Sequence, residues 1–275
     1  MAVEAEVADH YTTGGLFERI KAALKANGVD PETATPKDLK PVDEFHIGGV
    51  AATSDLLNQI DVKPSMHVLD IGSGIGGASR FVASATGCTV TGLDLTPEFV
   101  ETAKALGKMV GFDGRVNFQA GSALDMPFET DSFDAALLLH VGMNIPDKPR
   151  LMNEARRVLR PGASFAVYEV MKTNSEDIDY PVPWANTPET SFLATIEEYT
   201  TAAEAAGFTV IATRNRRTFA LDFFADLRAK LDAGGPTPLG VNLLMGETRA
   251  IKVKNMVANI SSGRIAPVEM ILNAT

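Results

Sequence analysis

The chain of 275 residues has 35 acidic and 25 basic side chains, a formal net charge of −10 and 45% hydrophobic residues. Its length allows one large α/β domain with additions, or at most a main domain and a small cap, and the apolar content supports a real core. The acidic balance argues against nucleic acid as a partner, because phosphate-binding proteins usually present a basic face. The sequence shows no apolar leader and no run near the roughly 18 apolar residues of a membrane span, so we expect a soluble, cytoplasmic protein without a membrane partner.

The first sixty residues predict a helical cap ahead of the main domain. Residues 7–27 place apolar side chains at helical spacing, and Gly28 follows as a stop signal. A polar loop is expected over residues 30–45, and a second helical pattern covers residues 46–60. We therefore assign residues 1–60 to an N-terminal helical cap that acts as a lid.

Strand-like and helix-like segments alternate after this cap, which is typical of parallel strands joined by crossover helices. The predicted strands lie at residues 67–71, 88–94, 115–121, 133–141, 163–170, 208–213 and 265–274. We expect an α/β fold with a doubly wound, mostly parallel sheet, whose core covers residues 61–213. Residues 214–275 are expected to add a C-terminal helical insertion and the last strand to the same domain.

The segment 171–191 is rich in proline and cannot form a regular helix or a central strand. It predicts a loop over the functional edge of the sheet. Its aromatic residues Tyr180 and Trp184 could form an aromatic wall for a cationic ligand through cation–π attraction. The alternative is that Trp184 simply pins the loop to the core.

A glycine-rich turn follows the first predicted strand. Gly72, Gly74, Gly76 and Gly77 let the backbone turn sharply and approach a ligand, and ligands of doubly wound sheets bind beyond the carboxyl ends of the strands. Asp94 ends the next strand, where a carboxylate accepts hydrogen bonds from ribose hydroxyls. The spacing fits both the dinucleotide fingerprint G-x-G-x-x-G and the pattern G-x-G-x-G.

Asp70 distinguishes between the two ligands that this turn could hold. A dinucleotide brings a doubly negative pyrophosphate, which a carboxylate two residues before the first glycine would repel. S-adenosylmethionine brings a sulfonium and an ammonium group, which the same carboxylate attracts. The alternative is that Asp70 only caps the following helix.

Over roughly residues 65–210 the sequence resembles the class I S-adenosylmethionine-dependent methyltransferases. The segment "VLDIGSGIGG" is similar to their first motif, "VTGLDLT" to their ribose-binding strand end, and "ARRVLRPGASFAVYEV" to a later helix, turn and strand. The segments "EFHIGGVAAT" and "GGASR" are similar to a small-molecule subgroup that includes sarcosine/dimethylglycine N-methyltransferases and tocopherol/sterol C-methyltransferases. The resemblance implies a seven-stranded, Rossmann-like sheet.

The resemblance also implies S-adenosyl-L-methionine as cofactor, with S-adenosyl-L-homocysteine as its product. The adenine-facing position, often an aspartate in this family, is Ser122 here, so we expect weaker anchoring of the adenine. The expected cofactor-binding residues are Asp70, Gly72, Gly74, Gly76, Asp94, Leu95, Ser122, Ala123 and His140.

Two residues are candidates for the chemistry. His140 ends a predicted strand beside the expected sulfonium, where an imidazole could accept a proton at neutral pH, or it packs locally. Tyr11 lies on the N-terminal segment that folds over the cofactor in similar enzymes, or it is a core aromatic residue. The candidate substrate-binding residues are His46, Asn144, Tyr180 and Trp184. Arg214, Arg216 and Arg217 could bind a substrate carboxylate, although a solvated strand end is expected.

The leading interpretation is a methyltransferase acting on a small molecule, with an amine nitrogen slightly favoured over oxygen, sulfur or carbon. The alternatives are a non-catalytic adenosylmethionine-binding subunit and, less favoured, a nicotinamide-dependent dehydrogenase. We expect no metal, because the single Cys88 excludes a thiolate cluster and methyl transfer from a sulfonium requires no metal ion. The protein is expected to be a monomer or a homodimer.

Overall fold

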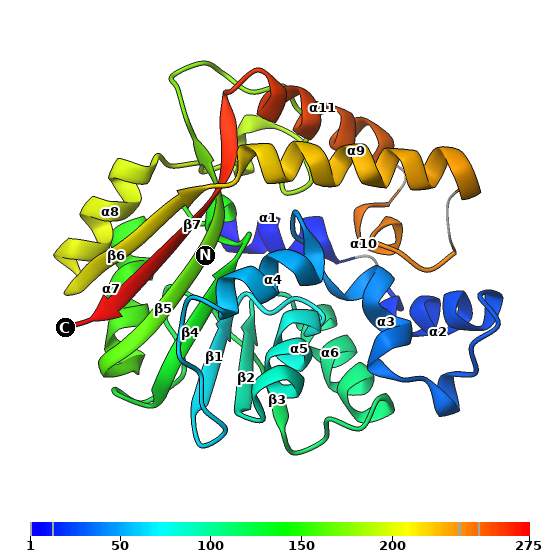
Figure 1. Ribbon diagram of the computed structural model, residues 1–275, viewed down its shortest axis with the longest axis horizontal. Helices are drawn as coiled ribbons and strands as arrows, with labels where there is room; N and C mark the ends of the chain where they lie inside the picture. Colours follow the sequence, from blue (N-terminus) through cyan, green and yellow to red (C-terminus); the bar gives the residue numbers. More distant parts are fainter. Residues whose placement is uncertain (1, 13, 236–237, 247) are drawn as a thin grey trace.

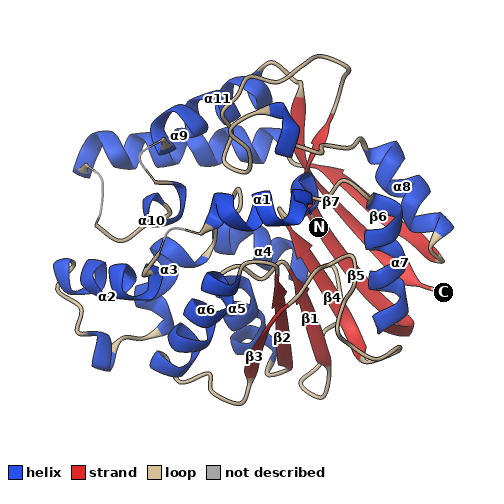
Figure 2. Cartoon of the chain, turned by 180° about the vertical axis from the view of Figure 1, so that it is seen from behind, coloured by secondary structure: helices blue, strands red, loops and turns tan. Residues whose placement is uncertain are grey.

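A seven-stranded sheet forms the centre of the computed structural model, which describes residues 2–12, 14–235, 238–246 and 248–275 (Figures 1 and 2). Its strands are β1 (His67–Ile71), β2 (Thr89–Asp94), β3 (Val116–Ala120), β4 (Phe133–Leu139), β5 (Leu159–Lys172), β6 (Phe208–Asn215) and β7 (Ile265–Ala274). They lie in the order β3-β2-β1-β4-β5-β7-β6, and β7 runs antiparallel to both of its neighbours. The predicted doubly wound, mostly parallel sheet is confirmed.

Helices cover both faces of the sheet because alternate residues of each strand point to opposite sides. The crossover helices are α5 (Gly77–Thr86), α6 (Pro97–Met109), α7 (Lys148–Val158) and α8 (Ile196–Ala205). On one face Leu69 of β1 packs with apolar side chains of α7 and α8. On the other face Val68, its neighbour in sequence, packs with α5 and α6. The buried strand β4 is apolar on both faces, which explains its unbroken run "AALLL".

The N-terminal region differs from the sequence expectation in two places. Its described residues form the α-helices α1 (Ala2–Tyr11), α2 (Leu16–Ala26), α3 (Pro36–Asp43) and α4 (Gly49–Leu57), and a 3-10 turn at Pro31–Thr33. The helical pattern over residues 7–27 is interrupted at Gly14 and Gly15, which have φ angles of 75° and 65° that end a right-handed helix. The expected polar loop contains α3, whose start is fixed by a capping box between Thr35 and Asp38.

The described C-terminal residues form three helices at the carboxyl edge of the sheet. Figure 1 shows the two longer ones above α1 and α4, and the short one to the right of α1. They are α9 (Arg217–Gly234), α10 (Asn242–Met245) and α11 (Arg249–Ser261), and we call them the roof helices.

The proline-rich segment forms a loop after β5, as predicted. Trp184 anchors this loop, since its side chain is buried and its indole N–H donates to the hydroxyl of Ser191 at 2.9 Å. The division at residues 60 and 213 stays a prediction.

The three arginines at the end of β6 and just after it differ in burial: Arg214 and Arg217 are exposed, whereas Arg216 is buried, so the expected solvated strand end is wrong for Arg216. Arg216 is buried, pairs with Glu269 at 2.9 Å and Asp55 at 2.7 Å, and stacks on a phenylalanine ring. Arg214 pairs with the same Glu269 at 2.6 Å. Arg217 donates to backbone carbonyls at the end of α11. These side chains therefore fasten α4, α9 and α11 to the sheet.

Candidate functional site

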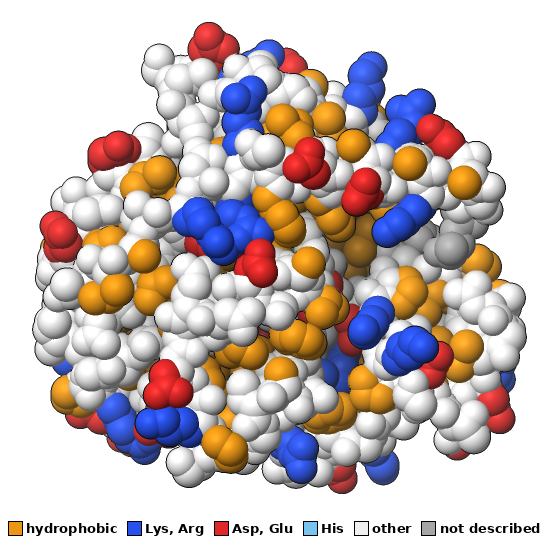
Figure 3. Space-filling view, viewed as in Figure 1, with side chains coloured by type: hydrophobic (Ala, Val, Ile, Leu, Met, Phe, Trp, Pro, Cys, Tyr) orange, Lys and Arg blue, Asp and Glu red, His pale blue; other side chains and the backbone are white. Residues whose placement is uncertain are grey.

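A cavity of about 470 Å³ lies at the carboxyl edge of the sheet, between helix α1 and the roof helices. Figure 3 shows a hollow beneath α9, with hydrophobic side chains inside it and Lys and Arg side chains near its rim. The glycine turn, the ends of β2 and β4, and the loop after β3 form the floor. Segments that are distant in sequence therefore meet at the edge where ligands of doubly wound sheets bind.

The glycine turn is shaped by close contacts with its surroundings. Gly72 has φ 74°, and a Cβ there would lie 2.3 Å from the Val141 side chain, so a larger residue cannot replace it without movement. The amide of Gly74 donates to Asp94 Oδ2 at 2.8 Å, while the direction of its missing Cβ is open. Gly76 then begins helix α5. The turn thus presents backbone to the cavity.

Two carboxylates lie under the turn and line the cavity. Asp94 accepts from the amides of Gly74 and Thr96, each at 2.8 Å, and burial raises its pKa. Asp70 accepts from the Ser79 hydroxyl at 2.5 Å, and burial raises its pKa to about 7. Asp70 therefore both ties the first turn of α5 and faces the cavity, so the two interpretations of this residue are compatible.

The loop after β3 forms one end of the cavity. Leu95, Ser122 and Ala123 line this end, as does Glu4 from helix α1. The Ser122 hydroxyl donates to the Glu4 carboxylate and accepts from the Leu124 amide at 3.0 Å. The carboxylate that the sequence appeared to lack at this place is therefore present, on a different element of the fold.

His140 follows β4 with φ 55°, a left-handed conformation that is uncommon for a residue other than glycine. Its Nδ1 donates to the carbonyl of Tyr168 at 3.0 Å, so Nε2 is the unprotonated nitrogen of the neutral ring. The Ile47 amide donates to Nε2 at a long 3.5 Å. Burial, together with the neighbouring His46, lowers the pKa of His140 to about 3. The ring is an uncharged acceptor at neutral pH.

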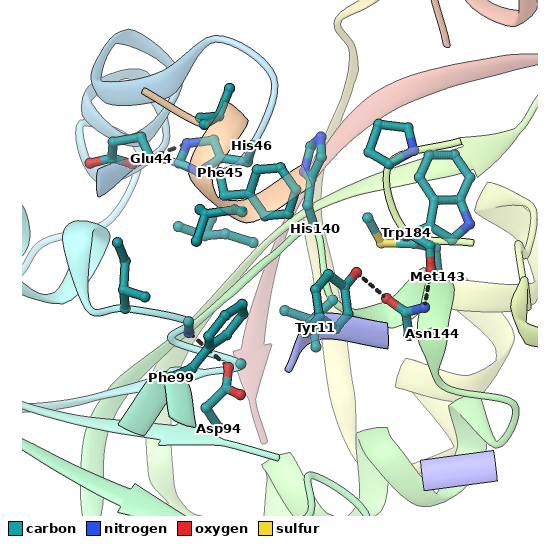
Figure 4. Close-up of a pocket in the computed structure, with 18 of the residues that line it drawn as sticks. Tyr11, Glu44, Phe45, His46, Asp94, Phe99, His140, Met143, Asn144 and Trp184 are labelled. Carbon is teal, nitrogen blue, oxygen red and sulfur yellow. Dashed lines mark hydrogen bonds and ion pairs between the residues drawn. The ribbon is translucent and has the colours of Figure 1, made fainter. Parts of the chain in front are cut away.

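A chain of hydrogen bonds joins helix α1, the turn after β4 and the proline-rich loop (Figure 4). The Tyr11 hydroxyl donates to Asn144 Oδ1 at 3.0 Å, and Asn144 Nδ2 donates to the Trp184 carbonyl at 2.9 Å. His10 donates to the neighbouring Pro183 carbonyl at 3.2 Å. The structure thus brings together Tyr11, Asn144 and Trp184, and all three line the cavity.

A buried polar group beside His140 contains one residue that the sequence analysis missed. The Thr53 hydroxyl donates to Glu44 Oε2 at 3.0 Å, and His46 Nε2 lies 3.4 Å from the same oxygen. Burial raises the pKa of Glu44 to about 7 and lowers that of His46 to about 4. Glu44 and His46 both line the cavity. The acid two positions before the histidine in "DEFHIGG" was the available signal.

Tyr180 is the predicted substrate-binding residue that the described cavity wall does not include. It packs with the apolar cluster around Trp184. Its role in substrate binding stays a prediction. In the described ranges of the chain, no group of three His, Cys, Asp or Glu side chains is placed to hold a metal ion, and no helix is long and apolar enough to cross a membrane.

Comparison with known proteins agrees with this geometry. Residues 69–167 match the family described as "Methyltransferase domain". A sterol 24-C-methyltransferase of Gibberella zeae is 37% identical over 124 residues, which are 45% of this chain and 33% of that protein. The methyltransferase GfsG of Streptomyces halstedii is 30% identical over 176 residues, 64% of this chain and 62% of that protein. The chain therefore spans about a third to three fifths of the length of these relatives.

The fold is shared with solved structures at low identity. A geranyl diphosphate C-methyltransferase of Streptomyces coelicolor, solved with Mg²⁺, geranyl diphosphate and S-adenosyl-L-homocysteine, superposes with a TM-score of 0.74 over 100% of this chain and 98% of that chain, at 17% identity. The glycine turn with its two carboxylates and the order of the strands agree with these likenesses: residues 69–167 match a methyltransferase domain, and the whole described chain shares the fold of solved methyltransferases.

Proposed function

We propose that the chain transfers a methyl group from S-adenosylmethionine to a small molecule bound beneath the roof helices. The observation that carries this proposal is a single cavity with two chemically different parts. One part contains Asp70, Asp94 and the backbone of Gly74, which suit a cationic nucleoside. The other part lies between His140 and the roof helices, where an acceptor has room.

The order of the strands supports an orientation for the cofactor. Asp94, at the end of β2, is the expected ribose acceptor, and Ser122 follows the neighbouring β3. The adenine would then lie toward β3, and the sulfonium toward β1 and β4, beside Asp70 and His140. When bound, S-adenosylmethionine would supply an electrophilic methyl group that a nucleophile attacks in line, with S-adenosyl-L-homocysteine as the leaving group.

The lining of the acceptor part supports a molecule with an apolar body. The roof contributes mainly hydrophobic side chains: Phe223, Phe224, Leu227, Leu231, Leu244, Met245, Val253 and Met256. Trp184 and Met143 continue this surface from the sheet side. Burial of apolar area contributes about 25 cal/mol per Å², so such a wall selects hydrophobic acceptors. Arg228 and Arg249 are the charged side chains that the described roof adds to the lining.

The protein groups near the expected methyl position can hold and remove a proton. His140 is a weak base, because its pKa is about 3, whereas an alkylammonium ion has a pKa of about 10. This arrangement favours an acceptor that reaches the site uncharged. Glu44, with a pKa of about 7, is a stronger proton acceptor on the same wall. The slight preference for an amine nitrogen stays a prediction, because the relatives include a C-methyltransferase.

Incubation of the pure chain with methyl-labelled S-adenosylmethionine and fractionated metabolite extracts tests the proposal. We expect a labelled product that partitions into organic solvent and disappears when His140 and Glu44 are both replaced. A Glu101→Gln variant on the exposed face of α6 is the matched control. Tight cofactor binding without transfer to any fraction would favour the non-catalytic subunit, and preferential binding of NADH would favour the dehydrogenase. A label confined to the aqueous fractions would contradict the apolar acceptor.

A further inference from the structure

We propose that Glu4 of helix α1 recognises the adenine ring of the cofactor. Its carboxylate would accept a hydrogen bond from the exocyclic amino group of the adenine. The inference rests on the proposed binding of S-adenosylmethionine. It assigns a recognition role to a residue outside the sheet core, on an element that also covers the cavity.

The first step is the position of Glu4 in the cavity. Its carboxylate accepts a hydrogen bond from the Ser122 hydroxyl, 118 residues away in sequence. Both side chains line the cavity, next to Leu95 and Ala123. This is the end of the cavity on the β3 side of Asp94, so it is where the base of a nucleoside lies once its ribose is bound to Asp94.

The second step is the chemistry of the base edge. Adenine presents an amino group, which donates hydrogen bonds, whereas hypoxanthine presents a carbonyl oxygen at the same place. A carboxylate is purely an acceptor with about four lone-pair sites, so Glu4 can accept from Ser122 and from an amino group together. The same carboxylate repels a carbonyl oxygen. Ser122 alone could donate or accept, and would distinguish the two bases poorly.

The third step is the element that carries Glu4. Helix α1 also holds Tyr11, which donates to Asn144 in the turn after β4, and both of these residues line the cavity. A base that satisfies Glu4 therefore stabilises the helix in the position where Tyr11 reaches Asn144. Recognition of adenine and closure over the acceptor part become one event.

Isothermal titration calorimetry with S-adenosylhomocysteine and S-inosylhomocysteine tests the proposal. The wild-type protein should bind the adenosyl compound about tenfold or more tightly, as expected for a hydrogen bond to a charged group. In Glu4→Ala this ratio should fall to about threefold or less. In Glu4→Gln, whose amide can also donate, the inosyl compound should gain affinity while the adenosyl compound loses it.

Glu6→Gln is the matched control, because Glu6 is an exposed acid on the same helix and does not line the cavity. It should keep the wild-type ratio, and thermal unfolding should confirm that each variant is folded. An unchanged ratio in folded Glu4→Ala overturns the role of Glu4 and leaves the proposed function intact. Failure of the wild-type protein to bind either compound overturns the proposed function as well.

Discussion

At the scale of single residues, Asp94 carries the clearest prediction. Its carboxylate is fixed by two backbone amides and lines the cavity, so it is placed to accept from ribose hydroxyls. Asp94→Asn keeps the size of the side chain but removes the charge, and we expect cofactor binding to weaken by about 1.5–3 kcal/mol. Calorimetry measures the loss, with Glu101→Gln as control. Unchanged affinity in the folded variant would show that the ribose lies elsewhere.

Gly74 gives a steric prediction at the same scale. No atom lies within 4 Å of a Cβ built on Gly74, and the residue lines the cavity, so we expect the branched side chain of Gly74→Val to occupy space that the cofactor needs. We expect binding to fall below detection, while the φ of 55° adds strain for any residue with a Cβ. Gly74→Ala separates the two effects, because it carries most of the strain and less of the bulk. Retained binding in both variants would place the ligand outside this turn.

The residues that sequence analysis found are those with local signals. Gly72, Gly74 and Asp94 follow directly from spacing after a strand, because a parallel sheet brings consecutive strand ends to one edge. Glu44 and Glu4 were missed, since their positions depend on how separate helices pack on that edge. No pattern within α1 indicates that Glu4 meets Ser122, which follows a strand 118 residues later.

At the scale of elements, helix α1 is expected to behave as a lid. Its hydrogen bonds go to Ser122 in the β3 loop, to Asn144 and to the Pro183 carbonyl, and these three residues all line the cavity. Chymotryptic cleavage at Tyr11 should therefore slow several-fold when S-adenosylhomocysteine is added, because a ligand that is covered by the helix stabilises it against opening. Equal cleavage rates without ligand and at saturating ligand would show that α1 is not a lid and that Tyr11 only packs against its neighbours. Cleavage at a phenylalanine on the far side of the molecule provides the reference rate.

Helices and strands were predictable where the hydrophobic pattern of the segment is clear. Buried strands such as β4 appear as apolar runs, and α7 and α8 as amphipathic segments. Helix α3 was hidden by two prolines and several charges, although the sequence "TPKD" carries its capping signal. The break between α1 and α2 was not predicted, because apolar residues have helical spacing on both sides of it. The pair Gly14–Gly15 was the signal that the helix is interrupted there.

At the scale of the whole molecule, buried acids make stability and binding depend on pH. Burial raises the pKa of Asp70 to about 7, above its value in an unfolded chain, so the folded state holds a proton that the unfolded state has lost. The contribution of Asp70 to stability is therefore fully present below about pH 4 and is lost as pH rises toward about 7. The variant Asp70→Asn should gain stability relative to wild type from pH 5 to pH 8, measured by chemical denaturation.

The same proton affects the cofactor. A cationic ligand beside Asp70 favours the ionised carboxylate, so wild-type affinity should increase as pH rises through about 7. The increase should reach several-fold and should be much smaller in Asp70→Asn. Calorimetry in buffers of different ionisation enthalpy should also detect proton release on binding. A pH-independent affinity in the wild-type protein would place the cations away from Asp70.

The pair Gly14–Gly15 also has a thermodynamic consequence. The Glu98 carboxylate accepts from the Gly14 amide at 3.0 Å and from the Leu16 amide at 2.9 Å, which pins the pair to the helix that begins three residues after Asp94. Two consecutive glycines gain more backbone entropy on release than any other pair of residues. The empty protein therefore populates open conformations more readily than one with a stiffer connection, and the measured affinity equals the intrinsic affinity multiplied by the closed fraction. A ligand that binds the closed form would have to offset this entropy loss, and the chain would regain the entropy when the product leaves.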